Sequence, residues 1–278
     1  MELILKKSVL ISVILALIAI SAGVGIYWGM SEDNSGQEKV FIYPGHVKVL
    51  QYNIDHGLNP GQELNLHNVE SLILQEKPDI VCLNSIDQGT KTSGYINQPR
   101  KIREAIDMPY SYGKANPADE GWSGNAIFTR FPIKFAQNIL FQEKNNDKNA
   151  FLYVIIGYED IELHVITTSL DSKNYKVRIR ELQEFIKERE LTEEHIILTG
   201  TFTIKQNERE IKDLSQKYHS IFNKTDLSFT YPSSKPEFRH DYMFVSKNIK
   251  IMDARVINSD LTRKTSQHLP ITANINIQ

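Results

Sequence analysis

The sequence has little cysteine and no excess of basic charge. Its 278 residues include a single cysteine, Cys82, which excludes an internal disulfide. Cys82 lies in the apolar run DIVCLNSI, where we expect a small buried thiol. The 32 Lys and Arg residues are slightly outnumbered by 34 Asp and Glu residues, so the formal net charge is -2. The basic surface typical of nucleic-acid-binding domains is therefore missing, and the composition gives no support for a nucleic-acid partner.

Charged residues are also absent between Ser8 and Ser31. This apolar segment is long enough to cross a hydrocarbon core, which requires about 20 residues. Two lysines precede the segment and an acidic pair follows it. The positive-inside rule therefore predicts a transmembrane signal anchor within residues 1–30, with the N-terminus in the cytoplasm. A signal peptide cleaved near Ser21 is the alternative, and it also places the rest of the chain outside the cytoplasm.

The rest of the chain divides into a short linker and one domain. Residues 31–45 are polar and contain glycine and proline, which suits a tether. Hydrophobic residues make up 41% of the chain and charged residues 24%, so a sizeable core can form. We therefore expect a single-pass protein of the cell membrane, with an extracytoplasmic domain at residues 46–278.

Short runs of β-branched and aromatic residues predict strands throughout this domain. The runs cover residues 47–54, 79–86, 125–133, 151–158, 162–170, 195–202, 241–246 and 271–277. Two segments, 64–77 and 176–191, have the spacing of amphipathic helices. The predicted apolar faces carry Leu66, Val69, Leu72 and Ile73 in the first segment, and Val177, Leu182, Phe185 and Ile186 in the second. This order of elements favours sheets covered by helices.

Seven motifs follow one another along the domain. They read VLQYNID, PDIVCLNSID, GNAIFTRFPI, VITTSLD, ILTGTFT, RHDYMFVS and SQHLPITA. Their order and spacing resemble the landmarks of the endonuclease/exonuclease/phosphatase superfamily, which has a deoxyribonuclease-like fold. The resemblance implies an α+β fold, a four-layer α/β/β/α sandwich with two packed β-sheets, and a site in the cleft at one end of the sheets.

The superfamily hydrolyses phosphoesters with water activated by a divalent metal ion. Such an ion takes hard oxygen ligands and neutralises charge on the phosphate, while a histidine oriented by a carboxylate deprotonates the water. The resemblance assigns four retained residues to this site: Asn53 and Asp55 in YNID, Asp241 in RHDYMF and His268 in SQHLP. Asp241 and His268 correspond to the orienting acid and the imidazole.

Other landmarks of the superfamily are replaced by neutral residues. Ser85 stands where LQEV has its metal-binding glutamate, and Ser169 stands where THL has its histidine. GDFN reads GTFT here, so Thr201 replaces an aspartate and Thr203 an asparagine; Gln267 replaces the aspartate of SDHLP. Because these changes remove most ligands, we expect no metal cofactor, with weakly bound Mg²⁺ or Mn²⁺ as the alternative.

Further side chains near these motifs have two interpretations each. Asp87 and Asp171 offer substitute carboxylates, although acids at strand ends are more often turn or cap residues. Asn125 of GNAIFTRFPI either contacts a ligand in the pocket or hydrogen-bonds to the backbone. Tyr112 and Trp122 either form an aromatic wall for a sugar or lipid headgroup, or pack within loops.

Several histidines lack metal-ligand spacing such as HxxxH, and we interpret them as structural or surface residues. They are His56, His67, His164, His195, His219 and His240. Lys247 and Lys250 are interpreted as part of a solvated face, with contact to a membrane surface as the alternative.

Two functions from different classes follow. The preferred hypothesis is a membrane-anchored, catalytically degenerate pseudoenzyme that binds a phosphorylated headgroup, a wall polymer or a protein. The alternative is a divergent metal-dependent phosphodiesterase or phosphatase, nuclease-like or phospholipase-like, which the four retained residues favour. A buried, hydrogen-bonded Asp241–His268 pair that stabilises the fold would also explain the retention of those two residues.

Overall fold

The computed structural model describes residues 46–142, 149–170, 174–205, 207–222 and 228–277. The predicted anchor and linker, residues 1–45, lie outside this part of the chain, and so does Asp171. Among the residues described, no helix is both long enough and apolar enough to cross a membrane.

The first of two mixed sheets contains the N-terminal and C-terminal strands of the domain. Its strand order is β11 (Ile249–Val256), β12 (Ile271–Ile277), β1 (Val47–Asn53), β2 (Ile80–Gln88), β4 (Gly121–Thr129) and β3 (Tyr110–Ala118). β1 and β2 are parallel, with Asn53 opposite Asn84. The two strands therefore end at the same edge of the sheet.

The second sheet repeats this arrangement with the middle of the chain. Its order is β5 (Ile133–Leu140), β6 (Ala150–Tyr158), β7 (Ile161–Leu170), β8 (His195–Phe202), β10 (Asp241–Val245) and β9 (His219–Ser220). β7 and β8 are parallel, and Thr201 near the end of β8 lies opposite both Ser169 of β7 and Asp241 of β10.

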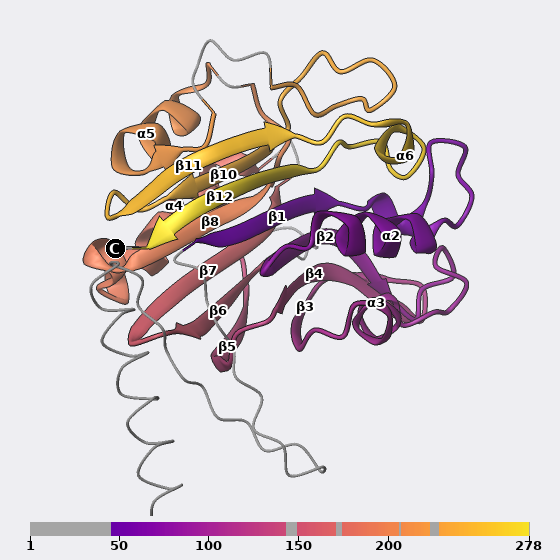
Figure 1. Ribbon diagram of the computed structural model, residues 1–278, viewed down its shortest axis with the longest axis horizontal. Coiled ribbons are helices and arrows are strands. Elements are labelled where there is room, and N and C mark those ends of the chain that lie inside the picture. The colour runs from indigo at the N-terminus through magenta and orange to yellow at the C-terminus, as the bar shows by residue number, and fades with distance from the viewer. Residues whose placement is uncertain (1–45, 143–148, 171–173, 206, 223–227, 278) are drawn as a thin grey trace, which may run out of the picture. The chain divides into compact units, whose positions relative to one another are not determined.

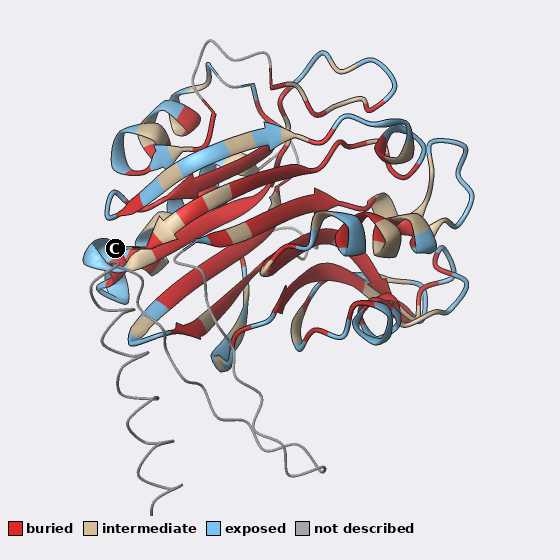
Figure 2. Ribbon diagram, in the orientation of Figure 1, coloured by how far each residue is buried: buried red, intermediate tan, exposed pale blue. Residues whose placement is uncertain are grey.

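Helices cover the outer faces of the sheets (Figures 1 and 2). Apolar side chains of α2 (Leu66–Glu76) and α3 (Gln98–Ile106) share one hydrophobic core with β1, β2 and β4. Those of α4 (Tyr175–Glu188) and α5 (Arg209–Lys217) share a second core with β7, β8 and β10. The remaining short helices are η1 (Asp55–Gly57), η2 (Leu191–Glu193) and α6 (Asp260–Arg263).

Buried polar side chains join the two sheets where their inner faces meet. Asn84 of β2 donates from Nδ2 to Thr167 of β7 at 3.1 Å, and accepts at Oδ1 from Gln51 Nε2 at 2.9 Å. Because an unpaired amide in such a place would cost about 1–3 kcal/mol, these bonds favour one registration of the sheets. The predicted α+β sandwich of two packed sheets is therefore confirmed.

The predicted strands agree with β1, β2, β4, β6, β7, β8, β10 and β12, but β3, β5, β9 and β11 were not predicted. The apolar face predicted for α2 is buried. The face predicted for α4 is wrong at Val177, which is 46% exposed, whereas Ile179, Leu182 and Ile186 are buried. Five positions separate Val177 from Leu182, which places their side chains about 140° apart around a helix of 3.6 residues per turn.

Candidate functional site

A chain of hydrogen bonds joins the retained residues at the end of the sandwich where β1 and β8 finish and β10 begins. Asn53 Nδ2 donates to Thr201 Oγ1 at 3.0 Å, and Thr201 Oγ1 donates to Asp241 Oδ1 at 2.8 Å. Asp241 Oδ2 lies 2.8 Å from His268 Nδ1. The structure therefore brings together Asn53, Thr201, Asp241 and His268, from both sheets, in one connected group.

Asp241 and His268 form a buried imidazole–carboxylate pair. Burial raises the pKa of Asp241, but the charge and hydrogen bond of His268 and the hydroxyls of Thr230 and Thr201 outweigh it and lower that pKa below its usual value. Burial lowers the pKa of His268, but the Asp241 charge and hydrogen bond, with a contribution from Asp55, raise it above its usual value. The pair thus favours an imidazolium beside a carboxylate.

The loop that carries His268 is tied to the end of β1. Ser266 Oγ donates to the carbonyl of Asn53 at 2.8 Å and accepts from the backbone N–H of His268 at 3.1 Å. His268 Nδ1 is engaged by Asp241, and its side chain keeps 11% of its surface exposed. Nε2 is therefore the ring atom available to a ligand.

The positions at which the resemblance implies other residues neighbour this group along the chain or across the strands. Ser85 occupies a β-bulge in β2 with a left-handed φ of 52°, one residue beyond Asn84. Ser169 lies opposite Thr201 on β7. Thr203 directly follows β8, and its N–H donates to the carbonyl of Leu170 at 3.0 Å.

Gln267 lies in the same loop as His268, and its carbonyl accepts from the N–H of Ser233 at 2.7 Å. Its side chain is half-buried.

Asn125 is buried and has both ends of its amide engaged inside the protein. Oδ1 accepts from Asn84 Nδ2 at 2.8 Å, and Nδ2 donates to the carbonyl of Ala150 at 3.1 Å. Of the two interpretations of Asn125, these contacts match the backbone-bonding one. The amide holds β4 of the first sheet against β6 of the second.

A second imidazole–carboxylate pair lies next to Asp55, and the sequence interpretation of His56 missed it. His56 Nδ1 is 2.8 Å from Asp87 Oδ1, and Asp87 is buried. The hydrogen bond from Asp87 raises the pKa of His56 despite burial, and the charges of Asp87 and Asp55 add to that effect. The available signal was the order YNIDH, in which an imidazole directly follows the retained acid.

The donor set does not fit the divalent-metal site that the resemblance implies. Asp241 accepts from Thr201 and is paired with His268, and Asp87 is held by His56 and Thr90, so two of the three nearby carboxylates are already engaged inside the protein. In the described part of the chain, no group of three or more His, Cys, Asp or Glu side chains is arranged to hold a metal ion. Divalent cations such as Mg²⁺ require several oxygen ligands, so we derive no step through a metal.

A group of stacked aromatic rings, which the sequence did not indicate, lies beside His268. The ring of Tyr231 lies 4.9 Å from that of His268 and 4.7 Å from that of His240. Phe238, which is 45% exposed, stacks on His240 at 5.9 Å. By contrast, Tyr112 Oη donates to the backbone carbonyl of Trp122 at 2.9 Å, which is local packing between β3 and β4.

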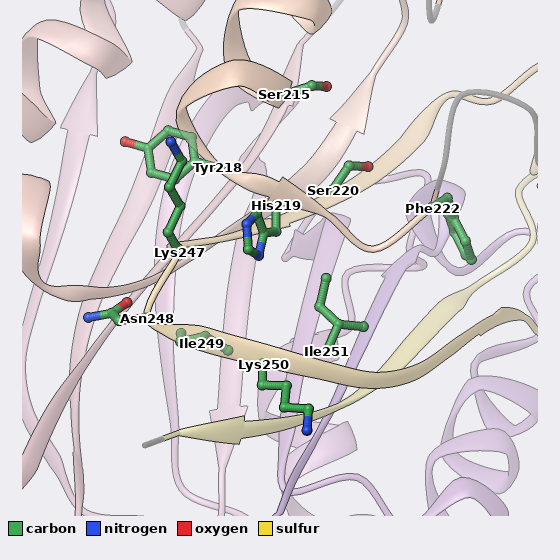
Figure 3. A pocket seen from close by; sticks show the side chains of 10 residues that line it. All are labelled: Ser215, Tyr218, His219, Ser220, Phe222, Lys247, Asn248, Ile249, Lys250 and Ile251. Carbon is green, nitrogen blue, oxygen red and sulfur yellow. The ribbon is translucent and has the colours of Figure 1, made fainter.

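An open cavity of about 820 Å³ lies elsewhere in the domain (Figure 3). Its lining comes from α5, β9, β11 and the turn between β10 and β11, and it includes Lys247 and Lys250. Lys247 follows the end of β10, whereas Asp241 begins that strand. The cavity is therefore at the opposite end of β10 from the candidate site.

Comparisons with known proteins agree with this fold. A family model described as "Endonuclease/Exonuclease/phosphatase family" matches residues 50–268. The uncharacterized protein YbhP of Escherichia coli (strain K12) is 22% identical over 250 residues, covering 83% of this chain and 96% of that protein.

Two solved structures share the fold at low sequence identity. A functionally unknown conserved protein from Enterococcus faecalis V583 has a TM-score of 0.69 at 15% identity, covering 83% of this chain and 100% of that one. A mannosyl-6-phosphatase from Bacteroides thetaiotaomicron VPI-5482 has a TM-score of 0.65 at 17% identity, covering 82% and 99%. Members of the matched family are usually metal-dependent phosphoric ester hydrolases. From the family match across most of its length and the shared two-sheet fold, the chain belongs to the endonuclease/exonuclease/phosphatase family.

Proposed function

We propose that this protein is a non-catalytic member of its family that binds a phosphorylated ligand at the site around His268. The observation that carries the proposal is the contact between Thr201 and Asp241. Thr201 occupies the position of a family acid, and its hydroxyl is used inside the protein, because it accepts from Asn53 and donates to Asp241. A neutral, hydrogen-bonded side chain therefore replaces a charged ligand that would face a metal.

The Asp241–His268 pair supports binding better than hydrolysis. A raised pKa favours the imidazolium, whose Nε2–H can donate a charge-assisted hydrogen bond to a phosphoryl oxygen. An imidazolium cannot take a proton from water, which is the role of the family histidine, so a raised pKa of His268 narrows the pH range in which it can act as a base. Loss of a single electrostatic stabiliser lowers turnover by about 10² to 10³, so several losses bring hydrolysis close to background.

The alternative function is that of a divergent metal-dependent phosphodiesterase or phosphatase. The observation in its favour is the Asp241–His268 geometry, in which a buried carboxylate holds the imidazole by Nδ1 and leaves Nε2 for a reacting group. This is the orientation that a general base requires. The binding protein and the hydrolase would therefore hold the phosphate at the same place. Only the hydrolase would also require a metal-activated water.

We also propose that the domain acts outside the cytoplasm, tethered by an anchor within residues 1–30. The support is the uncharged segment with lysines before it and acids after it. The ligand would then be a component of the cell envelope, a phosphorylated headgroup or a wall polymer, or a protein.

The test combines a binding measurement and an activity measurement on the full-length protein in detergent. Calorimetry with glycerophosphoglycerol should detect binding, and His268→Gln should weaken it about tenfold or more through loss of a charge-assisted hydrogen bond. His219→Gln, which changes an exposed histidine of the distant cavity, is the matched control. Hydrolysis of bis-p-nitrophenyl phosphate with Mg²⁺ or Mn²⁺ should stay at background. Metal-dependent hydrolysis that His268→Gln abolishes would establish the alternative instead.

A further inference from the structure

Hydrogen bonds position the His56–Asp87 pair, as they do the Asp241–His268 pair. Both oxygens of Asp87 are engaged, since Oδ1 lies 2.8 Å from His56 Nδ1 and Oδ2 accepts from Thr90 Oγ1 at 2.6 Å. Asp87 is 1% exposed, so this carboxylate is positioned by the protein and shielded from water. A buried acid held in this way orients an imidazole through Nδ1 and leaves Nε2 for another partner.

The backbone around His56 has an unfavourable conformation, and the buried side chain of Gln98 is one of the groups that hold it. Asp55 and His56 both have left-handed φ values, of 48° and 63°, which are costly for residues other than glycine. Gln98 of α3 donates from Nε2 to the carbonyl of His56 at 2.6 Å and accepts at Oε1 from the N–H of Asp87 at 2.8 Å. Such strain persists only where its surroundings enforce it, and it concentrates at functional sites.

Hydrogen bonds through Asn53 and Ser266 connect the turn that carries Asp55 and His56 to the loop that carries His268. The Asp55 carboxylate contributes to the raised pKa of both imidazoles, so it lies within electrostatic reach of both. The Asp55 N–H also donates to Asn53 Oδ1 at 3.0 Å, which ties this turn to the Asn53–Thr201–Asp241 chain. The His56 side chain is 37% exposed and that of His268 is 11% exposed, so His56 is the more open of the two.

The charges around this region discriminate among phosphorylated ligands. Three carboxylates accompany the two imidazoles, because Asp87 contacts His56, Asp241 contacts His268, and Asp55 directly precedes His56 in the chain. A doubly charged phosphate monoester is repelled more strongly by this excess of negative charge than a singly charged phosphodiester is. Asp55 can accept hydrogen bonds from hydroxyl groups close to the phosphate, which a polyol supplies.

We propose that His56 is a second ligand-binding residue of the candidate site, and that it and His268 together hold the phosphate of a polyol phosphodiester while Asp55 accepts from an adjacent hydroxyl. This inference rests on the proposed function, because it assigns the ligand of the same site. It adds a binding residue, His56, and a positioning residue, Asp87, and it selects a diester over a monoester.

The experiment compares three probes by calorimetry on the full-length protein in detergent. Glycerophosphoglycerol has both a diester and hydroxyls, diethyl phosphate has the diester alone, and glycerol 3-phosphate is a monoester. We expect glycerophosphoglycerol to bind most tightly, and His56→Gln to weaken its binding about tenfold or more. His219→Gln should bind as the wild type does. Tighter binding of glycerol 3-phosphate would overturn the assigned ligand class.

Failure of this inference can be told apart from failure of the proposed function. If His268→Gln weakens binding while His56→Gln leaves it within twofold of wild type, the role of His56 is wrong and the proposed function stands. If none of the probes binds, both are wrong. Should His56→Gln not fold, the ¹⁵N shift of the His56 Nε2 in the wild type provides the readout, because it must move when glycerophosphoglycerol is added. An unmoved shift would contradict the proposal.

The same chemistry occurs in a lipid headgroup and in a soluble polymer, and competition separates the two sources. Glycerol phosphate oligomers and micelles of a short-chain phosphatidylglycerol would each be tested for displacement of bound glycerophosphoglycerol. Displacement that depends on His56 by either competitor supports the proposal and identifies the source. Displacement by neither contradicts it.

Discussion

At the scale of single residues, Thr201 shows how a neutral side chain fits at a position where the resemblance implies an aspartate. Its hydroxyl lies between the amide of Asn53 and the carboxylate of Asp241, so the three side chains satisfy one another without a metal. An aspartate at this position would put a second carboxylate where the hydroxyl now donates to Asp241, and the two charges would repel. Threonine at position 201 is therefore compatible with a buried Asp241–His268 pair. The single change Thr201→Asp would not restore a metal site, because the new carboxylate would be repelled by Asp241.

Removal of the Thr201 hydroxyl should destabilise the protein. In Thr201→Val, Asn53 Nδ2 and Asp241 Oδ1 each lose a buried partner, which should cost about 1–3 kcal/mol. Thermal unfolding of the full-length protein in detergent should show a lower Tm than that of Thr201→Ser, which keeps the hydroxyl. Equal Tm values for the two variants would show that the hydroxyl does not hold the group together.

The Asp241–His268 pair should also make stability depend on pH. The pKa of folded His268 is above its ordinary 6.5 and that of folded Asp241 is below its ordinary 3.8. The His268 contribution is therefore full below about pH 6.5 and is lost as the pH rises through the folded pKa of His268. The Asp241 contribution is full above about pH 4 and is lost as the pH falls through the folded pKa of Asp241.

The measurement is the difference in Tm between the wild type and His268→Gln as a function of pH. We expect this difference to be largest between about pH 4 and pH 6.5 and to shrink at higher pH, since the charged imidazole is then lost. His219→Gln should show no such trend. A difference that stays constant to about pH 9 would contradict the raised pKa of His268.

At the scale of elements, α4 shows that spacing alone can select the wrong face. Ile179, Leu182 and Ile186 follow one another at three and four positions and pack into the core with β7 and β8. The sequence interpretation included Val177, which is exposed. Charged residues on both sides of the helix leave the pattern ambiguous, and contact with the sheet decides which stripe is buried.

Because Ile179 is buried and Val177 is exposed, truncation of the two side chains to alanine should have unequal effects on stability. Ile179→Ala should destabilise the domain by about 2–5 kcal/mol, because it removes buried methyl groups from a packed core. Val177→Ala should change stability by no more than about 0.5 kcal/mol, as surface substitutions usually do. Thermal unfolding of the two variants side by side measures this. A larger effect for Val177→Ala would favour the face predicted from the sequence.

At the scale of the whole molecule, the candidate site depends on the docking of the two sheets. β1 contributes Asn53 and leads into Asp55, whereas β8 and β10 of the other sheet contribute Thr201 and Asp241. His268 enters from the loop before β12. Because neither sheet carries the site alone, disruption of the polar contacts between them should disturb ligand binding as well as stability.

The predicted topology places this whole domain outside the cytoplasm. A protease added to intact cells or protoplasts should therefore remove the domain while a cytoplasmic marker survives. The expectation follows from the lysines before the uncharged segment and the acids after it. Digestion only after lysis would contradict the topology, and a soluble domain released into the medium would favour a cleaved signal peptide.

Local sequence determined the strands β1, β2, β4, β6, β7, β8, β10 and β12 and the helix α2. In these segments apolar and β-branched residues recur with one period, and burial enforces that period. Motif order determined the family and the two-sheet sandwich. It also identified Asn53, Asp241 and His268 as residues of one site. These features could be predicted because each depends on neighbouring residues or on order alone.

Only the tertiary structure decided which side chains satisfy one another. Asn53 and Thr201 are 148 residues apart, and His56 and Asp87 are 31 residues apart. Their contacts arise from strand register and sheet docking, and His56 reaches Asp87 from a left-handed backbone that no periodic pattern encodes. Periodicity reports which face of an element is buried, whereas the partner of a buried polar group depends on where the rest of the chain folds.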